Sequence, residues 1–250
     1  NHEEFELKIV CINAYNDIPN QIKEEGIEII ELKNYSGPFD WSAHKKVQQI
    51  ISEFKPDIIH GAVFEGVTLA AINGFIKNVP CVIIEETSDP VNRSWRGHFL
   101  MKIFGFLANY SIGVSKTAEH YLLHKVKIPA KKVKLIQNGV RSAKVYSQQA
   151  CDLLREKWNI TPQDFVFISV GRMNSEPQKQ FKVLIQTFAK VAQVHKNAKL
   201  ILVGEGNQKQ EYIDLAQKLQ VLDQVIFTGY QAEVDQFFAI SHTFCLFSAF

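Results

Sequence analysis

Two cations follow a strongly apolar segment in the second half of the chain and could together hold an anion. Residues 165–170 run into Gly171 and Arg172, and a polar loop then leads to Lys179 at the start of an expected helix. Glycine lets a ligand approach the backbone closely, and a helix N-terminus favours negative charge. An arginine and a lysine placed there fit a clamp for a diphosphate. They fit a solvated basic loop equally well, so residue types alone leave both interpretations open.

Two further glycine turns follow apolar runs in the same way. Gly204-Glu-Gly comes after residues 200–203, and Gly229-Tyr comes after residues 225–227. The first turn is not a dinucleotide-binding sequence, because Lys209 takes the place of the third glycine and no acid follows the next strand to hold a ribose hydroxyl. Since parallel strands bind ligands at their carboxyl ends, we expect all three turns to line one edge of a sheet.

Metal and nucleophile chemistry find less support. No Asp-x-Asp occurs, so the usual carboxylate grip on a metal–diphosphate complex is missing. His120 and His124 are four residues apart and could share a metal on one helical face, but no third ligand is apparent and ordinary surface histidines are the simpler interpretation. Ser115 lacks the second glycine of a nucleophile elbow, which argues against a hydrolase. His60 ends an expected buried strand and is either a satisfied polar residue or a ligand contact.

Positive charge is concentrated between residues 93 and 134. Two interpretations are open: a solvated lysine-rich face, which we weight more heavily, and docking on anionic lipid, to which each basic residue near the surface contributes about 1 kcal/mol. The basic residues are Arg93, Arg96, Lys102, Lys116, Lys125, Lys127, Lys131, Lys132 and Lys134.

These residues must be positioned by elements that alternate along the whole chain. Short apolar runs without polar alternation are typical of parallel strands covered on both faces, and amphipathic stretches of helical length separate them. This alternation predicts an α/β architecture with parallel sheets flanked by helices. The expected strands are residues 7–12, 27–32, 57–60, 81–84, 110–114, 133–136, 165–170, 199–203, 225–227 and 244–247. The expected helices are residues 42–54, 67–76, 116–126, 180–195 and 208–219.

Composition bounds the class of protein and its division into domains. The chain has 250 residues, 46% of them hydrophobic, which suits one or two domains with ordinary cores. Lys+Arg at 28 against Asp+Glu at 26 gives a net charge of +2, too balanced for a dedicated nucleic-acid binder. The four cysteines form no Cys-x-x-Cys pair and suit a reducing cytoplasm. Residues 141–150 are polar and aperiodic, so we predict a linker there between domains 1–140 and 151–250.

At this point the motifs resemble glycosyltransferase family 4. The donor-domain resemblance rests on Val170-Gly-Arg with Lys-Gln-Phe-Lys-Val-Leu-Ile-Gln-Thr-Phe, on Leu202-Val-Gly-Glu-Gly and on Val225-Ile-Phe-Thr-Gly-Tyr. Upstream, Pro56-Asp-Ile-Ile-His, Ile112-Gly-Val-Ser-Lys and Ile136-Gln-Asn-Gly-Val are similar to the acceptor domain and the crossover. The resemblance implies a retaining enzyme of the GT-B fold, with two Rossmann-like domains, that moves a sugar from a nucleotide-diphosphate-sugar to a glycan, lipid or small-molecule acceptor.

The same resemblance implies roles for individual residues. Arg172 and Lys179 would hold the diphosphate and stabilise the charge that develops as the nucleotide leaves, with no cofactor and no metal. The donor side would comprise Gly171, Arg172, Lys179, Gly204, Glu205, Gly229 and Tyr230. The acceptor side would comprise His60, Glu86 and Asn138, with Glu86 as a further catalytic candidate.

Three departures from the family pattern qualify these implications. Glu86 stands where the family often has a histidine, and the loop from Arg172 to Lys179 is longer than usual. The family's two-glutamate motif would come after Phe250, and its glycine-rich loop would precede Asn1. We therefore expect both domains to be cut short and this stretch alone to be inactive. The alternatives are a sugar-nucleotide epimerase of the same fold and a non-catalytic sugar-nucleotide binder. We expect a cytoplasmic location, with peripheral membrane association on its inner face under the docking interpretation.

Overall fold

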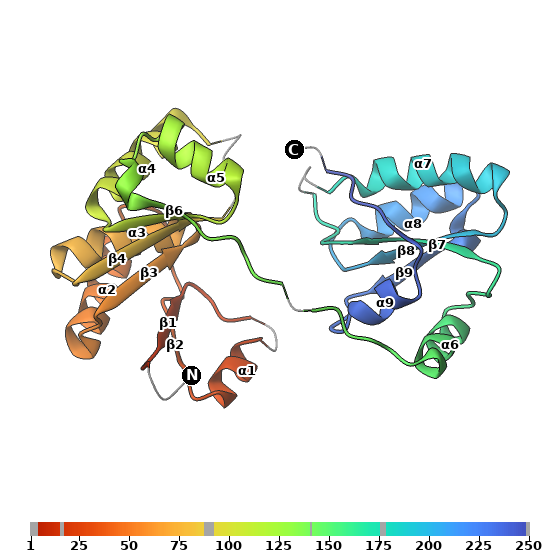
Figure 1. Ribbon diagram of the computed structural model, residues 1–250, viewed down its shortest axis with the longest axis horizontal. Coiled ribbons are helices and arrows are strands. Elements are labelled where there is room, and N and C mark those ends of the chain that lie inside the picture. The colour runs from red at the N-terminus through yellow and green to blue at the C-terminus, as the bar shows by residue number, and fades with distance from the viewer. Residues whose placement is uncertain (1–4, 16–17, 88–92, 141, 176–178, 249–250) are drawn as a thin grey trace. The chain divides into compact units, whose positions relative to one another are not determined.

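The computed structural model divides into two compact units, Asn1–Val140 and Arg141–Phe250 (Figure 1). It describes residues 5–15, 18–87, 93–140, 142–175 and 179–248. Both units are layered α/β structures in which all paired strands named below run parallel. The α/β prediction with parallel sheets flanked by helices is confirmed.

A four-stranded sheet in the order β3-β4-β5-β6 forms the centre of the first unit. Its strands are β3 (Ile58–Ala62), β4 (Cys81–Glu86), β5 (Tyr110–Gly113) and β6 (Val133–Leu135). The helices around it are α2 (Trp41–Phe54), α3 (Val63–Ile76), α4 (Trp95–Leu107), α5 (Lys116–His120), a π-helix (Tyr121–Lys125) and a 3-10 helix (Ala130–Lys132). One core joins helices and sheet: Val47 and Ile51 of α2, Val67 of α3, Phe104 of α4 and Ile84 of β4 are all buried in it.

The first three elements of the chain stand apart from this sheet. β1 (Lys8–Cys11) and β2 (Glu28–Glu31) pair in register as a separate two-stranded sheet, with α1 (Ile18–Glu24) between them in sequence. No residue of β1, α1 or β2 is fully buried in the part of the chain that the structure describes. Leu32, directly after β2, does reach the core of the unit. The N-terminal segment therefore contributes little to the core of the unit.

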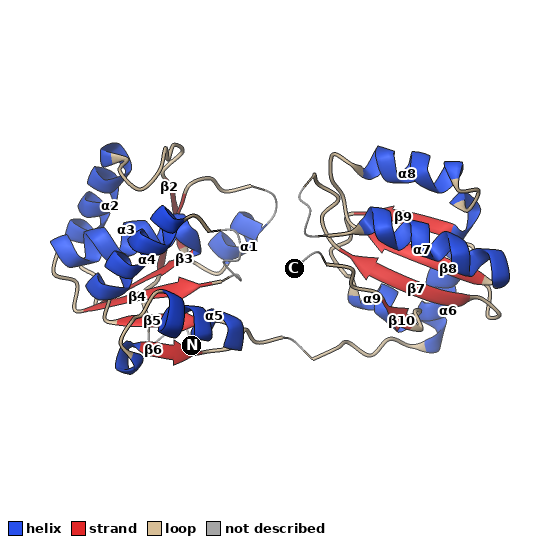
Figure 2. Cartoon of the chain, turned by 90° about the horizontal axis from the view of Figure 1, so that it is seen from above, coloured by secondary structure: helices blue, strands red, loops and turns tan. Residues whose placement is uncertain are grey.

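The second unit is a sheet in the order β10-β7-β8-β9 with helices on both faces (Figure 2). Side chains alternate across it, as the strand pleat requires: Leu200 and Leu202 pack with α7 and α8, whereas Ile201 and Val203 pack with α6 and α9. Its strands are β7 (Phe165–Val170), β8 (Ala198–Val203), β9 (Val225–Gly229) and β10 (Thr243–Phe244). Its helices are α6 (Gln148–Lys157), α7 (Phe181–Val194), α8 (Lys209–Lys218), α9 (Asp235–Ala239) and a 3-10 helix (Leu222–Gln224).

Three local expectations differ from the structure. The stretch 116–126 is not one α-helix, because the chain widens into a π-turn at Tyr121, whose carbonyl accepts from the Val126 amide at 3.0 Å. The segment expected over 244–247 is shorter and earlier: the strand β10 comprises Thr243 and Phe244, and the Cys245 amide still donates to the Ile168 carbonyl of β7 at 2.7 Å. The polar stretch 141–150 is not all linker, since the Ser147 hydroxyl accepts from the Ala150 amide and starts α6 at Gln148.

Candidate functional site

The three glycine turns of the second unit lie side by side at the carboxyl ends of β7, β8 and β9. The Gly171 amide donates to the Val203 carbonyl at 3.0 Å, and the Gly204 amide donates to the Gly229 carbonyl at 2.9 Å. One turn further on, the Met173 amide donates to the Glu205 carbonyl at 2.9 Å. The expected meeting of these turns at one sheet edge is therefore a feature of the structure. We call this row of turns, with the residues that flank it, the glycine edge.

Backbone passes so close to backbone at the glycine edge that side chains do not fit. A Cβ on Gly204, whose φ is +141°, would lie 1.9 Å from the Gly171 carbonyl oxygen. A Cβ on Gly206 would lie 2.3 Å from the Met173 carbonyl carbon and oxygen. Because only glycine satisfies both the torsion and the spacing at Gly204, the edge presents bare backbone at this point.

The two sequence-predicted cations flank this bare backbone. The side-chain stem of Lys179 lies against Gly171, since a Cβ there would be 3.4 Å from Lys179 Cγ. Arg172 follows Gly171 directly and is exposed, whereas Lys179 is half-buried. Two residues after Lys179, α7 begins at Phe181, so the positive end of a fourteen-residue helix lies at the same place. The arrangement can hold an anion between charged side chains and backbone amides.

The remaining donor-side residues complete the edge on the β8–β9 side. Glu205 Oε1 accepts from Lys209 Nζ at 2.5 Å, one helical turn away. The same carboxylate oxygen would lie 2.8 Å from a Cβ on Gly229, so the missing side chain there leaves room for Glu205. Tyr230, which follows Gly229 directly, is 74% exposed.

In the first unit, a second carboxyl edge carries the acceptor-side candidates. His60 of β3 and Glu85 of β4 lie within hydrogen-bonding distance, with His60 Nε2 3.1 Å from Glu85 Oε2. Val63, immediately after β3, has a φ of +61° and is 58% exposed. A left-handed torsion is unfavourable for a β-branched residue, so this turn is strained. Asn138 lies in the exposed segment that follows β6. Among the described residues, no hydrogen bond joins it to His60 or Glu85.

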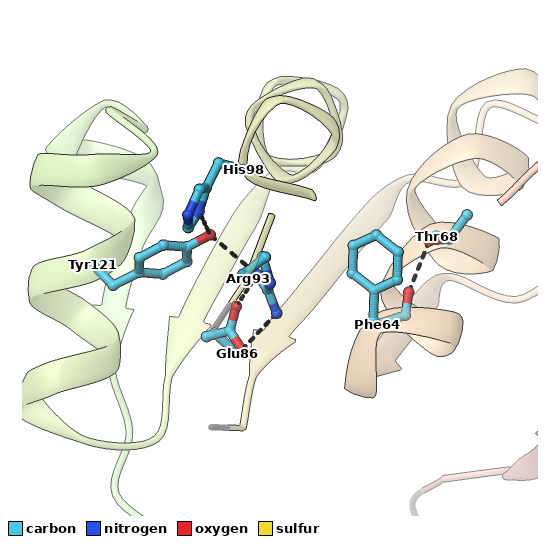
Figure 3. A network of polar contacts seen from close by, with 6 residues as sticks. All are labelled: Phe64, Thr68, Glu86, Arg93, His98 and Tyr121. Carbon is cyan, nitrogen blue, oxygen red and sulfur yellow. Dashed lines mark hydrogen bonds and ion pairs between the residues drawn. The ribbon is translucent and has the colours of Figure 1, made fainter. Parts of the chain in front are cut away.

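Glu86 is buried rather than exposed at the surface of this edge. Only 3% of the residue is exposed, and both carboxylate oxygens accept from Arg93, at 2.6 Å from Nη1 and 3.1 Å from Nη2 (Figure 3). The Arg93 guanidinium lies 5.5 Å from the ring centroids of both Phe64 and Tyr121. Arg93 Nη1 also donates to Tyr121 Oη at 3.1 Å. We call Glu86, Arg93, Phe64, Tyr121 and His98 the Glu86–Arg93 network.

The network shifts the titration of its members. Burial works against the charged form of Arg93, but the hydrogen bond and charge of Glu86 outweigh it and raise the pKa of Arg93. Burial raises the pKa of the Tyr121 phenol. Burial, followed by the charges of Lys125 and Arg93, lowers the pKa of His98. His98 is therefore neutral at neutral pH. Its Nδ1 lies 2.9 Å from Tyr121 Oη and can accept a hydrogen bond from the phenol.

Arg93 and Tyr121 are the residues that sequence reasoning missed. The expectation that Arg93 contributes to a basic face is wrong, because its side chain is only 16% exposed and is committed to Glu86. No local sequence pattern predicts the pairing of Arg93 with Glu86. Residues 88–92, between them in the sequence, lie outside the described structure. Ser115 has a local structural role, since its hydroxyl accepts from the Ala118 amide and caps α5.

A metal centre does not emerge from the described part of the chain. His120 and His124 do lie close, with ring centroids 4.3 Å apart. Over residues 5–15, 18–87, 93–140, 142–175 and 179–248, however, no group of three or more His, Cys, Asp and Glu side chains could hold a metal ion. Nor does any described helix have the length and apolarity needed to cross a bilayer.

Comparisons with known proteins point to glycosyltransferases. A family model described as Glycosyltransferase Family 4 matches residues 4–144, and one described as Glycosyl transferases group 1 matches residues 152–250. An uncharacterized glycosyltransferase of Methanocaldococcus jannaschii is 26% identical over 211 residues, which cover 80% of this chain and 52% of that protein. N-acetyl-alpha-D-glucosaminyl L-malate synthase of Bacillus anthracis is 27% identical over 125 residues, 50% of this chain and 32% of the relative. The chain thus spans about half the length of the first of these curated relatives.

A solved structure shows the fold. HepE of Anabaena, crystallised with UDP and glucose, superposes with a TM-score of 0.80 at 18% identity, over 96% of this chain and 66% of that one. The two parallel-sheet units therefore have the GT-B fold expected from the sequence.

Proposed function

The chain belongs to glycosyltransferase family 4, and on that premise we propose that the protein transfers a sugar from a nucleoside-diphosphate-sugar to an acceptor, with retention of the anomeric configuration and without a metal. The observation that carries the proposal is the glycine edge. Bare backbone, two cations and a helix N-terminus converge there, and this combination suits a diphosphate better than a neutral ligand. Parallel strands bind ligands at this end.

Each donor-side residue then has a physical task. Arg172 and Lys179 hold the diphosphate and stabilise the negative charge that grows on it as the glycosidic bond to the leaving nucleotide breaks. Gly171, Gly204 and Gly229 keep the backbone open to the donor. Glu205 and Tyr230 contact the sugar or the nucleoside from the β8–β9 side. Two cations supply the positive charge that a metal supplies in other transferases, so the reaction needs no metal.

On the acceptor side, we assign His60 and Asn138 to contacts with the acceptor. Glu86 acts differently from the catalytic role that the sequence suggested. Because it is buried and bound at both oxygens by Arg93, we propose it as a positioning residue that fixes Arg93 and, through it, Tyr121.

We also propose that the protein acts in the cytoplasm. The four cysteines are free thiols, which suits a reducing compartment.

The diphosphate assignment is tested by nucleotide binding in the full-length protein. Arg172→Ala with Lys179→Ala removes both cations, and we expect affinity for UDP, measured by calorimetry, to fall by about a hundredfold, since each charge-assisted contact contributes about 1.5 kcal/mol or more. Lys182→Ala is the matched control, because Lys182 lies in the same unit on α7 with an exposed side chain and pairs with Glu211. Equal affinities of the double variant and the control would refute the assignment.

The reaction type is tested by its product. With a nucleotide-sugar and an acceptor, we expect a new glycosidic bond of the donor's anomeric configuration, seen by NMR, and a rate unaffected by EDTA. An inverted product would overturn retention, and loss of the rate in EDTA would overturn metal independence. An epimerised sugar without a glycosidic bond would identify a sugar-nucleotide epimerase instead. Binding without any turnover would identify a non-catalytic binder.

A further inference from the structure

Helix α4 is apolar on two opposite sides. One side, with Met101, Phe104 and Gly105, is buried in the core of the first unit. The other side is exposed: Trp95 is 74%, Phe99 59%, Ile103 39% and Phe106 77% exposed. We call these four residues the α4 stripe. Figure 1 places α4 at the outer surface of its unit.

The α4 stripe is continuous along the helix. Its members are spaced by four, four and three residues, so at 100° per residue they lie within one side of α4, opposite Phe104. The stripe runs along the helix axis for roughly 17 Å. Large apolar side chains that gather in this way on a surface mark a contact with another apolar phase, whereas scattered ones do not.

Cations border the stripe. By the same helical geometry, Arg96 lies along one side of it and Lys102 along the other. At the end of α4, Lys132 Nζ donates to the carbonyls of Phe106 and Ala108, at 2.8 and 2.6 Å, and lies 5.6 Å from the Phe106 ring centroid. From residue 93 to residue 134, every charged residue is Lys or Arg except Glu119.

We propose that the α4 stripe docks the protein on an anionic lipid surface. The apolar side chains enter the boundary between headgroups and acyl chains, and the bordering cations contact lipid phosphates. An exposed apolar band edged by cations on a helix that lies flat is the pattern of an interfacial helix, and Trp is favoured at the depth of the headgroups. The charge complementarity favours an anionic bilayer, because the two residues that flank the stripe on α4, Arg96 and Lys102, are both cations.

This surface is independent of the glycine edge, which lies in the other unit. The inference therefore goes beyond the proposed function, and either can fail without the other. Of the two interpretations of the basic residues 93–134, a solvated face and lipid docking, the proposal adopts docking. Arg93 is not part of the docking surface, because it is paired with Glu86.

The first test is co-sedimentation of the full chain with vesicles of phosphatidylcholine, either pure or mixed with an equal part of phosphatidylglycerol. We expect binding to the anionic vesicles that weakens as salt is added. Phe99→Ser with Phe106→Ser should weaken it about tenfold or more, since each exposed ring loses its transfer into an apolar phase. Arg96→Gln with Lys102→Gln should weaken it about thirtyfold on anionic vesicles. Phe39→Ser is the control, because Phe39 is 66% exposed in the same unit but precedes α2.

The second test reads insertion directly. The chain has three tryptophans, Trp41, Trp95 and Trp158, and Trp158 packs against the core of the second unit. In a Trp41→Phe background, we expect the emission of Trp95 to shift to the blue on anionic vesicles and to be quenched by brominated lipid. Since the replaced residues are exposed, circular dichroism should report the same fold for all variants.

Three results would overturn the proposal. One is wild-type protein that stays in the supernatant with anionic vesicles at low salt. Another is a Phe99 and Phe106 double variant that binds as the wild type does. The third is a wild-type dimer that becomes monomeric when the stripe is changed, because the stripe would then be covered by a second copy of the chain.

Discussion

Both units have a parallel-sheet edge at the carboxyl ends of their strands, but the charged residues at the two edges differ in exposure. At the glycine edge of the second unit, backbone lies bare between Gly171 and Gly204, and Arg172 is exposed beside it. At the corresponding edge of the first unit, the Glu86–Arg93 network encloses an anion and a cation against each other, between two aromatic rings. One edge therefore has an exposed arginine, whereas the arginine of the other is paired with a buried carboxylate.

This difference in exposure determines how each edge can bind a ligand. An open edge with an exposed arginine and a half-buried lysine can bind an anionic group by contributing positive charge and backbone amides. A buried ion pair instead holds side chains in place, because a carboxylate bound at both oxygens fixes the arginine and the residues that contact it. Under the proposed function, this contrast suits binding of a charged donor by the second unit and positioning of an acceptor by the first. Four substitutions can break or sharpen it.

The largest effect is expected from Gly204→Ala. The new Cβ would combine a φ of +141° with a position 1.9 Å from the Gly171 carbonyl oxygen, so we expect a loss of about 4 kcal/mol in the free energy of unfolding, from backbone strain and overpacking together. Urea denaturation measures it. Gly37→Ala is the matched control, because Gly37 has a φ of +133° but no atom within 4 Å of the added Cβ. Equal losses in the two variants would show that bare backbone is not what the glycine edge requires.

Glu86→Ala should cost about 3 kcal/mol of unfolding free energy, because it leaves the Arg93 charge largely buried without its carboxylate. The comparison variant is Glu233→Ala, which breaks the pair with Lys144, whose side chains are more than half exposed. That pair should contribute less than about 1 kcal/mol. If both variants lost the same amount in urea denaturation, the first edge would not be held by an enclosed ion pair.

Val63→Gly should have the opposite sign and a smaller size. Glycine accepts a φ of +61° without strain, and we expect about 1 kcal/mol of stabilisation after its own entropic cost. Val183→Gly, in the first turn of α7 and 40% exposed, should instead destabilise, because glycine is a poorer helix former. A destabilised Val63→Gly protein would mean that the turn after β3 is not strained.

The smallest effect concerns His98. Its pKa is lowered, first by burial and then by Lys125 and Arg93, so the folded state disfavours its protonation. The stability that neutral His98 contributes is therefore present above the ordinary pKa of 6.5 and is lost as the pH falls through that value toward the lowered one. We expect an NMR titration midpoint below 6.5 that rises in Lys125→Gln but not in Lys127→Gln. A midpoint that Lys125→Gln leaves unchanged would remove Lys125 from the network's electrostatics.

The glycine edge could be foreseen and the Glu86–Arg93 network could not, for a physical reason. β7, β8 and β9 are each largely apolar runs that lead into a glycine, so a local pattern specifies both the strand and its turn, and β7 occupies the predicted residues 165–170. The partner of Glu86 depends on where tertiary packing carries Arg93 and Tyr121, and charge composition alone places Arg93 on the surface. The π-turn at Tyr121 is likewise set by packing rather than by periodicity.

The separate β1–β2 sheet has a consequence for how the molecule opens. With no fully buried residue in β1, α1 or β2 as described, this segment has little apolar contact to lose, so it forms a cooperative unit that unfolds well below the global free energy. Its backbone amides should exchange with deuterated solvent long before those of β3 through β6. Leu32, buried at the end of β2, marks the boundary at which protection should begin.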